Sequence, residues 1–196
     1  MSLDLEIRAF LRTPPVQEIN FSMRGIRVTG LGFAVLSVHF SDQPVPQRIG
    51  VTVRPELVGA QNDAVYDSVS DTIHLRSDTV LQTTVGQSHV LHECTHAQID
   101  LRGRGTSIRS EEGAAFIAEA WFLLACGVAD AAVDRLVGAA VRTIAADLRR
   151  RFQATGLIPE TTADQINSAR TAMRDRGYRN GYYVENGLAG HVYRGD

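Results

Sequence analysis

Residues 92–96 read His-Glu-Cys-Thr-His, and this pentapeptide restricts what the surrounding chain can fold into. On an α-helix, two residues four positions apart lie on one face about one turn from each other, so both imidazoles can reach one cation. An apolar stripe of the kind that packs a helix on a core accompanies the motif. It consists of Val85, Val90, Leu91 and Ile99. The pattern predicts a helix over about residues 82–101.

The residue types in this motif favour a zinc site. Zinc binds neutral imidazole nitrogens, and in catalytic sites it keeps one coordination position for water. We therefore predict that His92 and His96 are zinc ligands. Glu93 follows the first histidine, within reach of that water, and is predicted to be the general base. The alternative is an ordinary amphipathic helix that carries two partly buried histidines.

A tetrahedral catalytic zinc site needs a third protein ligand from outside this helix. The next acidic residues are Glu111 and Glu112, in a second predicted helix that begins near Ser110. If this helix packs antiparallel on the first, a glutamate is placed beside the metal. The alternative is that both glutamates only stabilise the first turn of their own helix, behind a serine N-cap, through the helix dipole.

The first eighty residues read mainly as strands and turns. Alternating or β-rich runs occur at Ile26–Thr29, 33–40 and 49–53, and glycine and proline residues separate them. Residues 66–75 read as a hairpin with a Ser-Asp turn. These segments predict an N-terminal, mainly antiparallel β-sheet.

The remainder of the chain reads as helical. Segments rich in alanine and leucine at 129–153 and 160–176 predict two helices after the two already described. Thr161 or Thr162 is placed to cap the last of them. Strands first and helices after them indicate an α+β domain, with the motif in its helical part.

The chain has the size and composition of one globular domain. It contains 196 residues, of which 44% are hydrophobic, and two cysteines, too few for a disulfide framework. We therefore predict a single domain over 1–196. It is expected to be strand-rich over 1–80, helical over 81–176 and irregular in the tail, 177–196.

Charge and hydropathy exclude several classes of partner. The formal net charge is −2 with both signs well mixed, so neither nucleic acid nor an anionic membrane surface is indicated. No segment approaches the roughly 18 consecutive apolar residues of a membrane span. Asp4 and Glu6 stand where a secretory signal peptide would need basic residues. We expect a soluble protein, with the cytoplasm as its compartment.

The motif and the glutamates after it resemble the gluzincin metallopeptidases, the thermolysin-like group, in a minimal single-domain form. The resemblance covers about residues 64–124. In that family a glutamate ligand comes from a following helix, often within Glu-x-x-Ala, and both Glu111 and Glu112 satisfy this pattern here. Ala115 and Phe116 match the small-then-aromatic continuation of such helices, so the resemblance implies Glu112 as the third zinc ligand.

The same resemblance implies that this α+β domain is zincin-like and that it catalyses zinc-dependent hydrolysis of peptide bonds. In the family an edge strand before the motif helix pairs with an extended substrate, and Thr72–Leu75 would be that edge in a complex with a peptide or protein. Glu119 is a candidate by position for the carboxylate that supports a zinc ligand. The metzincin family is excluded, because it requires a third histidine where this chain has Arg102.

The implied mechanism assigns most of the chemistry to zinc and Glu93. Glu93 takes a proton from a zinc-activated water, and the proton passes to the leaving nitrogen. A protein donor would help to hold the oxyanion. Candidates in the tail are Tyr182, Tyr183, His191 and Tyr193.

Two other classes of function remain open from the sequence. In the first, the fold binds a peptide without cutting it, which the intact Glu93 argues against. In the second, zinc is structural and a fourth protein ligand, His89 or Asp100, fills the position of the water. Both lie on the same predicted helix as His92 and His96, which makes tetrahedral closure awkward. The sequence does not indicate the oligomeric state.

Overall fold

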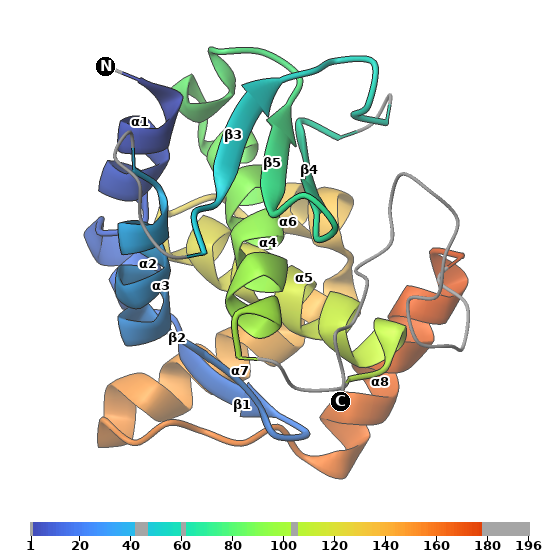
Figure 1. The fold of residues 1–196 in the computed structure, drawn as a ribbon. Coiled ribbons are helices and arrows are strands. Elements are labelled where there is room, and N and C mark those ends of the chain that lie inside the picture. The colour runs from blue at the N-terminus through green and yellow to red at the C-terminus, as the bar shows by residue number, and fades with distance from the viewer. Residues whose placement is uncertain (1, 42–46, 60–61, 103–105, 178–196) are drawn as a thin grey trace.

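The fold is mixed α+β, and the computed structural model describes residues 2–41, 47–59, 62–102 and 106–177 (Figure 1). The strands are β1 (Asn20–Met23), β2 (Ile26–Thr29), β3 (Gly50–Val53), β4 (Ala64–Asp67) and β5 (Thr72–Leu75). The helices are α1 (Leu3–Phe10), α2 (Pro14–Gln17), α3 (Gly30–Leu36), α4 (Thr84–Asp100), α5 (Ile108–Ala125), α6 (Asp130–Val137), α7 (Ala139–Thr155) and α8 (Ala163–Asp175). Two short 3-10 turns, η1 (Ser37–His39) and η2 (Val80–Gln82), complete the described elements.

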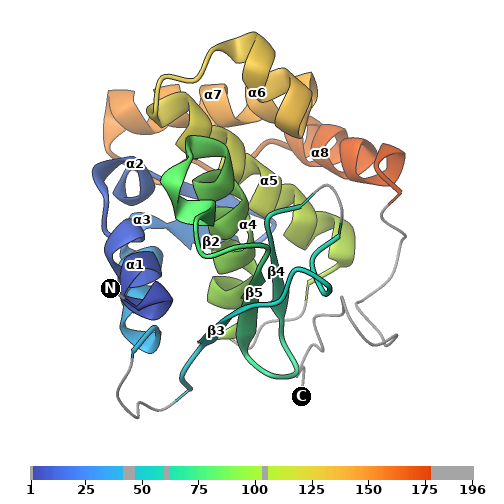
Figure 2. The same cartoon turned by 90° about the horizontal axis from the view of Figure 1, so that it is seen from above.

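Helices α4 and α5 pack against each other at the centre of the molecule. Every residue of α5 from 110 to 123 is buried. A helix that is buried on all sides needs partners on all sides. Helices α6, α7 and α8 cover α5, while α3 and the small sheets lie on the side of α4 (Figure 2). The glutamates of α5 are therefore held inside the protein, where they need partners of their own.

The helices predicted from the second half of the sequence are confirmed. Helix α4 begins and ends within two residues of the predicted bounds, and α5 begins at Ile108, two residues before the predicted start. The segment 129–153 divides into α6 and α7 at Gly138, whose φ of 91° breaks the helix. Thr162 caps α8 through a capping box with Gln165.

The predicted strand over residues 33–40 is wrong, because this run forms α3 and η1. An apolar run without alternation is compatible with a buried strand or with a short helix. Local hydrogen bonding favours the helix here. The side chain of Thr29 accepts a hydrogen bond of 3.0 Å from the backbone N–H of Gly32, as an N-cap does.

The strand-rich character predicted for residues 1–80 is also wrong. Helices α1 and α2 come first, and they contribute Ile7, Leu11 and Val16 to the core. The strands are four residues long each and form two separate sheets, a β1–β2 hairpin and a three-stranded sheet. The single N-terminal sheet that the sequence predicted is therefore absent from the described residues.

Strand β5, Thr72–Leu75, is the central strand of the three-stranded sheet, so its predicted edge position is wrong. The strand order is β3–β5–β4, with β3 parallel and β4 antiparallel to β5. The predicted hairpin exists as β4 and β5. The sequence could not show that β3 adds to the other side of β5, because parallel pairing joins segments far apart in the chain. The edge beside α4 is instead β4.

Gly30 lies where two segments of backbone meet, and it gives a test of this packing. A Cβ at position 30 would be 2.1 Å from the carbonyl oxygen of Gln17. We expect Gly30→Ala to lower the free energy of unfolding by about 2–3 kcal/mol, measured by urea denaturation, because backbone must move to make room. Gly59→Ala is the control, since its Cβ would meet nothing closer than 3.8 Å. Equal unfolding midpoints for the two variants would contradict the close approach.

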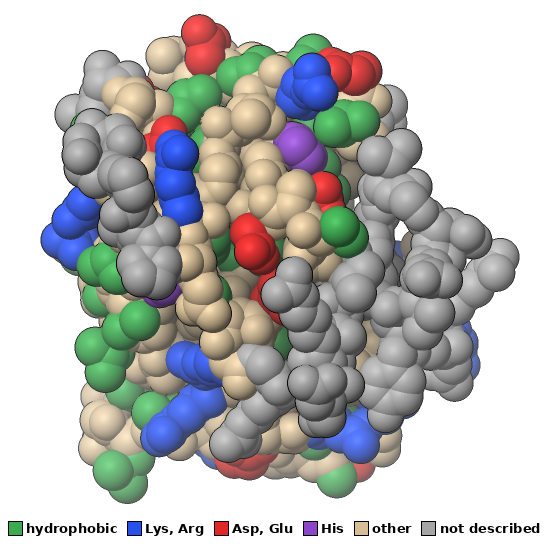
Figure 3. Space-filling model, in the orientation of Figure 1, with side chains coloured by type: hydrophobic (Ala, Val, Ile, Leu, Met, Phe, Trp, Pro, Cys, Tyr) green, Lys and Arg blue, Asp and Glu red, His purple; other side chains and the backbone are tan. Residues whose placement is uncertain are grey.

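Charges of both signs are mixed on the described surface, as the sequence indicates. On the face shown in Figure 3, acidic and basic side chains are interspersed with apolar ones, and no broad area of one sign forms there. Among the helices that the structure describes, none combines the length and the apolar character that crossing a membrane requires.

Candidate metal centre

Helix α4 presents His92 and His96 on its side toward α5. The centroids of the two imidazole rings are 5.0 Å apart, and both residues are buried, with 8% and 2% of their surface exposed. The start of the helix is fixed by Thr83, whose side chain accepts a hydrogen bond from the N–H of Gly86. Both imidazoles thus lie on one face, one turn apart, as the motif predicted.

Helix α5 places Glu112 opposite both imidazoles. Oε2 of Glu112 lies 3.3 Å from Nε2 of His92, and Oε1 lies 3.7 Å from Nε2 of His96. One potential ligand atom from each of the three residues falls within 4.8 Å of the others, and all three side chains are buried. The structure therefore brings together the residues that the sequence suggested as metal ligands.

The second nitrogen of each imidazole faces another glutamate of α5. Nδ1 of His92 is 3.2 Å from Oε2 of Glu119, and Nδ1 of His96 is 2.9 Å from Oε1 of Glu111. Ser88 donates a hydrogen bond of 3.2 Å to the other oxygen of Glu119. A carboxylate acceptor at Nδ1 keeps the proton there and leaves the lone pair on Nε2, which is the tautomer that binds a metal.

The two adjacent glutamates of α5 therefore occupy different positions. Glu112 faces the Nε2 atoms of both histidines, whereas Glu111 faces the Nδ1 atom of His96. Phe116, which guided the choice of Glu112 from the sequence, packs edge-on against the ring of His92 at a centroid distance of 4.5 Å. This arrangement suits Glu112 as a ligand and Glu111 as a residue that orients one.

The donor set and its spacing fit zinc. Two bonds of about 2.0–2.1 Å at a tetrahedral angle put ligand atoms roughly 3.3–3.4 Å apart. The separations of 3.3 and 3.7 Å between Glu112 and the two imidazoles are close to that spacing. The carboxylates of Glu111, Glu112 and Glu119 are all buried, and buried negative charge needs positive charge nearby. A divalent cation at the centre of this group would supply that charge.

The glutamates at the Nδ1 atoms give a second testable prediction. We expect Glu111→Gln and Glu119→Gln each to weaken zinc binding about 10- to 100-fold, because an amide no longer fixes the imidazole as strongly as a carboxylate does. Competition with a chromophoric chelator measures the affinity. Glu160→Gln, at an exposed position, is the matched control and should bind zinc as the wild type does. Wild-type affinity in both site variants would rule out the orienting role.

Glu93 connects the metal-binding group to the sheet. Its Oε2 accepts a hydrogen bond of 2.8 Å from the backbone N–H of Tyr66 in β4. Burial raises the pKa of the Glu93 carboxyl, and the imidazoles of His92 and His96 partly oppose this rise. A carboxyl with a raised pKa is suited to exchange protons near neutral pH, which is what the predicted general base must do.

The N–H of Tyr66 belongs to the edge of β4 that faces away from β5. Asp63 forms a hydrogen-bonded pair with Arg76 across the hairpin, with an N–H to carbonyl distance of 2.8 Å. Because such pairs alternate along an antiparallel ladder, Tyr66, three residues further on, directs its N–H and C=O away from β5. Glu93 therefore binds the described sheet at its outer edge.

The carboxylates also change the acidity of the histidines. Burial acts to lower the pKa of His92, but the hydrogen bonds with Glu112 and Glu119 outweigh it and raise the pKa well above its usual value. For His96, burial dominates and lowers the pKa, although Glu112 opposes the change. In the metal-free protein, His92 is thus the favoured place for a proton that a metal would displace.

His89 and Asp100, considered from the sequence as fourth ligands, have other partners. Nδ1 of His89 is 2.9 Å from Oδ2 of Asp63, and Asp100 accepts a hydrogen bond of 3.0 Å from the hydroxyl of Tyr66. Neither belongs to the group of potential metal ligands found among the described residues. Their placement does not favour a closed, structural zinc site.

The two cysteines do not belong to the group of potential metal ligands found among the described residues. Cys94 is buried in the core and Cys126 is exposed, and both are free cysteines. The four candidates for the oxyanion donor lie outside the described residues, and their role stays a prediction. They are Tyr182, Tyr183, His191 and Tyr193.

Comparison of the chain with models of protein families, with curated proteins and with solved structures gives no match. The resemblance to gluzincins therefore rests on the residues of this chain.

Part of the site did carry a signal in the sequence, because Glu112 and Glu119 are seven residues apart and share a helix face. The orienting position of Glu111 and the backbone contact from Tyr66 had none, since both depend on how the elements pack.

Proposed function

We propose that this chain is a zinc-dependent peptidase, with His92, His96 and Glu112 as ligands and Glu93 as the general base. One observation carries the proposal. Both imidazoles direct Nε2 toward a buried glutamate while a different glutamate faces each Nδ1. Two histidines buried only for packing have no need of three carboxylates. A catalytic zinc site uses ligands of this kind together with carboxylates that orient them.

In this proposal the residues of the site have separate roles in hydrolysis. Zinc, when bound, would polarise the substrate carbonyl and lower the pKa of a water molecule. Glu119 and Glu111 keep the imidazoles in the orientation that binds. Glu93 takes the proton of the attacking water and delivers it to the leaving nitrogen.

The outer edge of β4 is where an extended peptide or protein substrate would bind in this proposal. Strand β4 ends the order β3–β5–β4 of the described sheet, and a strand added at a sheet edge gains affinity from main-chain hydrogen bonds. Glu93 contacts this edge at Tyr66, so a peptide along β4 would pass close to the base. This edge takes the place of Thr72–Leu75, which has a strand on each side.

The second candidate is a peptide-binding module without catalysis. The same outer edge of β4 supports it, and in the hydrogen bond with Tyr66 the carboxylate of Glu93 serves as a structural acceptor. The two candidates differ in turnover. A binding module holds a peptide intact, whereas a peptidase releases fragments with new amino termini.

Elemental analysis tests whether the chain binds zinc, on which the proposal depends. We expect about one zinc ion per wild-type chain purified without added zinc, and its loss in His96→Ala, because one of three ligands is removed. His74→Ala, a histidine of β5 outside the group, is the control and should keep the metal. Wild-type protein that contains no zinc and cannot be loaded with it would end the proposal.

A further inference from the structure

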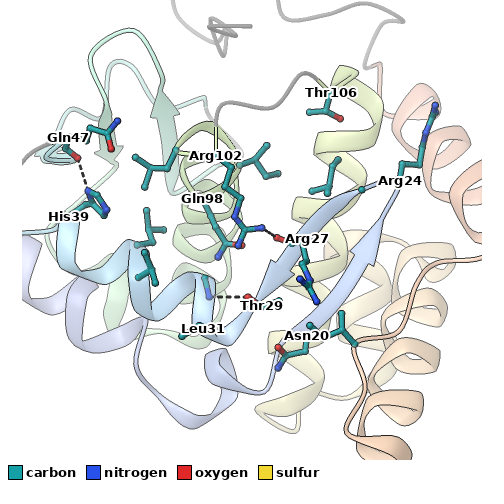
Figure 4. A pocket seen from close by; sticks show the side chains of 18 residues that line it. Asn20, Arg24, Arg27, Thr29, Leu31, His39, Gln47, Gln98, Arg102 and Thr106 are labelled. Atoms are coloured by element: carbon teal, nitrogen blue, oxygen red, sulfur yellow. Dashed lines mark hydrogen bonds between the residues drawn. The ribbon is translucent and has the colours of Figure 1, made fainter. Parts of the chain in front are cut away.

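A second site is suggested by a pocket of about 1,070 Å³ that shares no residue with the metal centre. Its walls come from the β1–β2 hairpin, from α3 and from the last turn of α4 (Figure 4). The hairpin and α3 follow one another in the chain, whereas the end of α4 is distant in sequence, so the pocket exists only in the folded chain. Its volume is of the order found for small-molecule sites, about 300–1,000 Å³.

The charge around this pocket has one sign. Arg24, Arg27 and Arg102 line it together with His39, and the described lining residues include no aspartate or glutamate. Arg24 and Arg27 are exposed, and the ion pairs formed among described residues involve neither of them. In a protein whose net charge is −2, such a local excess of positive charge favours an anion.

The opposite wall of the pocket is apolar. Leu31 and Val35 of α3 line it with 75% and 54% of their surface exposed, and Val38, one turn on, is 44% exposed. Buried Leu36 and Ile99 extend this apolar lining inward. Apolar side chains exposed one turn apart on a helix, beside a cavity, are suited to contact an apolar group of a ligand.

Arg102 shapes the pocket between these two walls. Its guanidinium crosses from α4 to β2 and donates to the backbone carbonyl of Arg27 (Figure 4). Gly32 of α3 leaves room for this crossing, because a Cβ there would lie 2.7 Å from the side chains of Arg102 and Gln98, which would have to shift. Since Arg102 holds the backbone of Arg27, the side chain of Arg27 can be replaced without loss of this hydrogen bond.

We propose that this pocket binds a small anionic amphiphile, a molecule with a carboxylate or phosphate head and an apolar chain. Arg27 binds the head, because a guanidinium matches the geometry of both anions. The chain lies against Leu31 and Val35. The site is independent of the zinc centre, and neither proposal needs the other.

Calorimetric titration of the full chain with four probes tests the proposal. Octanoate carries both features, 1-octanol has the chain alone, acetate has the head alone, and octyl phosphate exchanges one head for the other. We expect one octanoate per chain, with octanol and acetate at least about tenfold weaker, since each lacks one of the two sets of contacts. Octyl phosphate shows which head the site prefers. Equal binding of acetate and octanoate would mean an adventitious ion only, and no binding of octanoate would overturn the proposal.

Two variants locate the binding. Arg27→Glu reverses a charge at the pocket and is expected to weaken octanoate binding about tenfold. Arg54→Glu, at an exposed position outside the lining of this pocket, should leave octanoate binding unchanged. Leu31→Asp should weaken octanoate more than acetate. Thermal unfolding of each variant checks that the fold is retained. Wild-type affinity in Arg27→Glu and Leu31→Asp would place the ligand elsewhere and overturn the proposal.

Discussion

Glu93→Gln is expected to lower the rate of peptide hydrolysis by at least about 1,000-fold while the zinc content stays at the wild-type level. A positioned general base typically contributes about 10²–10⁴-fold to a rate. Glutamine has the shape of glutamate and can still accept the hydrogen bond from the N–H of Tyr66, so the packing around β4 is kept. It cannot take a proton from water. Fluorescence release from a quenched peptide library, read together with elemental analysis, measures both quantities.

The control for this variant is Glu56→Gln, a glutamate exposed between β3 and β4. It should retain the wild-type rate and the wild-type zinc content. Loss of zinc in Glu93→Gln would mean that Glu93 acts on the metal site itself. Full activity with zinc bound would show that another group is the base and would contradict the assignment.

The second large effect is expected in Glu112→Gln, which should lose most of the folding stability that bound zinc adds. A ligand that binds only the folded state at about 1,000 times its Kd adds about 4 kcal/mol to the free energy of unfolding. For a chain of this size, that corresponds to a rise in Tm of about 10 °C. Glu112→Gln removes the carboxylate ligand, and a thousandfold loss of affinity leaves only about 0.4 kcal/mol. Calorimetric melting with and without zinc measures the difference.

The same experiment on Glu111→Gln distinguishes the role of Glu111 from that of Glu112. A 10- to 100-fold loss of affinity still leaves about 1.4–2.7 kcal/mol of stabilisation, so this variant should keep a clear rise in Tm on adding zinc. The opposite result, with the zinc response lost in Glu111→Gln and kept in Glu112→Gln, would reverse their roles. No response in the wild type would contradict zinc binding to the folded state.

The helices of the second half could be predicted because their signals are local. The motif in α4 and the cap at Thr162 lie within a few residues of the structure they specify. The candidate ligands followed for the same reason, since His92, His96 and Glu112 are on neighbouring helices joined by a short connection.

The errors occurred where the sequence pattern is ambiguous or where contacts distant in sequence decide the structure. The apolar run at 33–40 carries no alternation, and its start is fixed by the contact of Gly30 with Gln17 and by the cap at Thr29. The central position of β5 depends on β3, which pairs with it although β4 lies between them in the sequence. The basic pocket could not be predicted, because Arg102 joins Arg24 and Arg27 only through the packing of α4 beside the β1–β2 hairpin.

The position of Glu93 separates the capacity to hold a metal from the capacity to use it. All the proposed ligands and the glutamates that orient them lie on α4 and α5, between His92 and Glu119. The contact that positions the base comes instead from Tyr66, in a sheet built from the first half of the chain. Damage to that half would leave a protein that still carries zinc but no longer aligns its base. Metal content alone is therefore a poor guide to whether a sample of this protein is competent for catalysis.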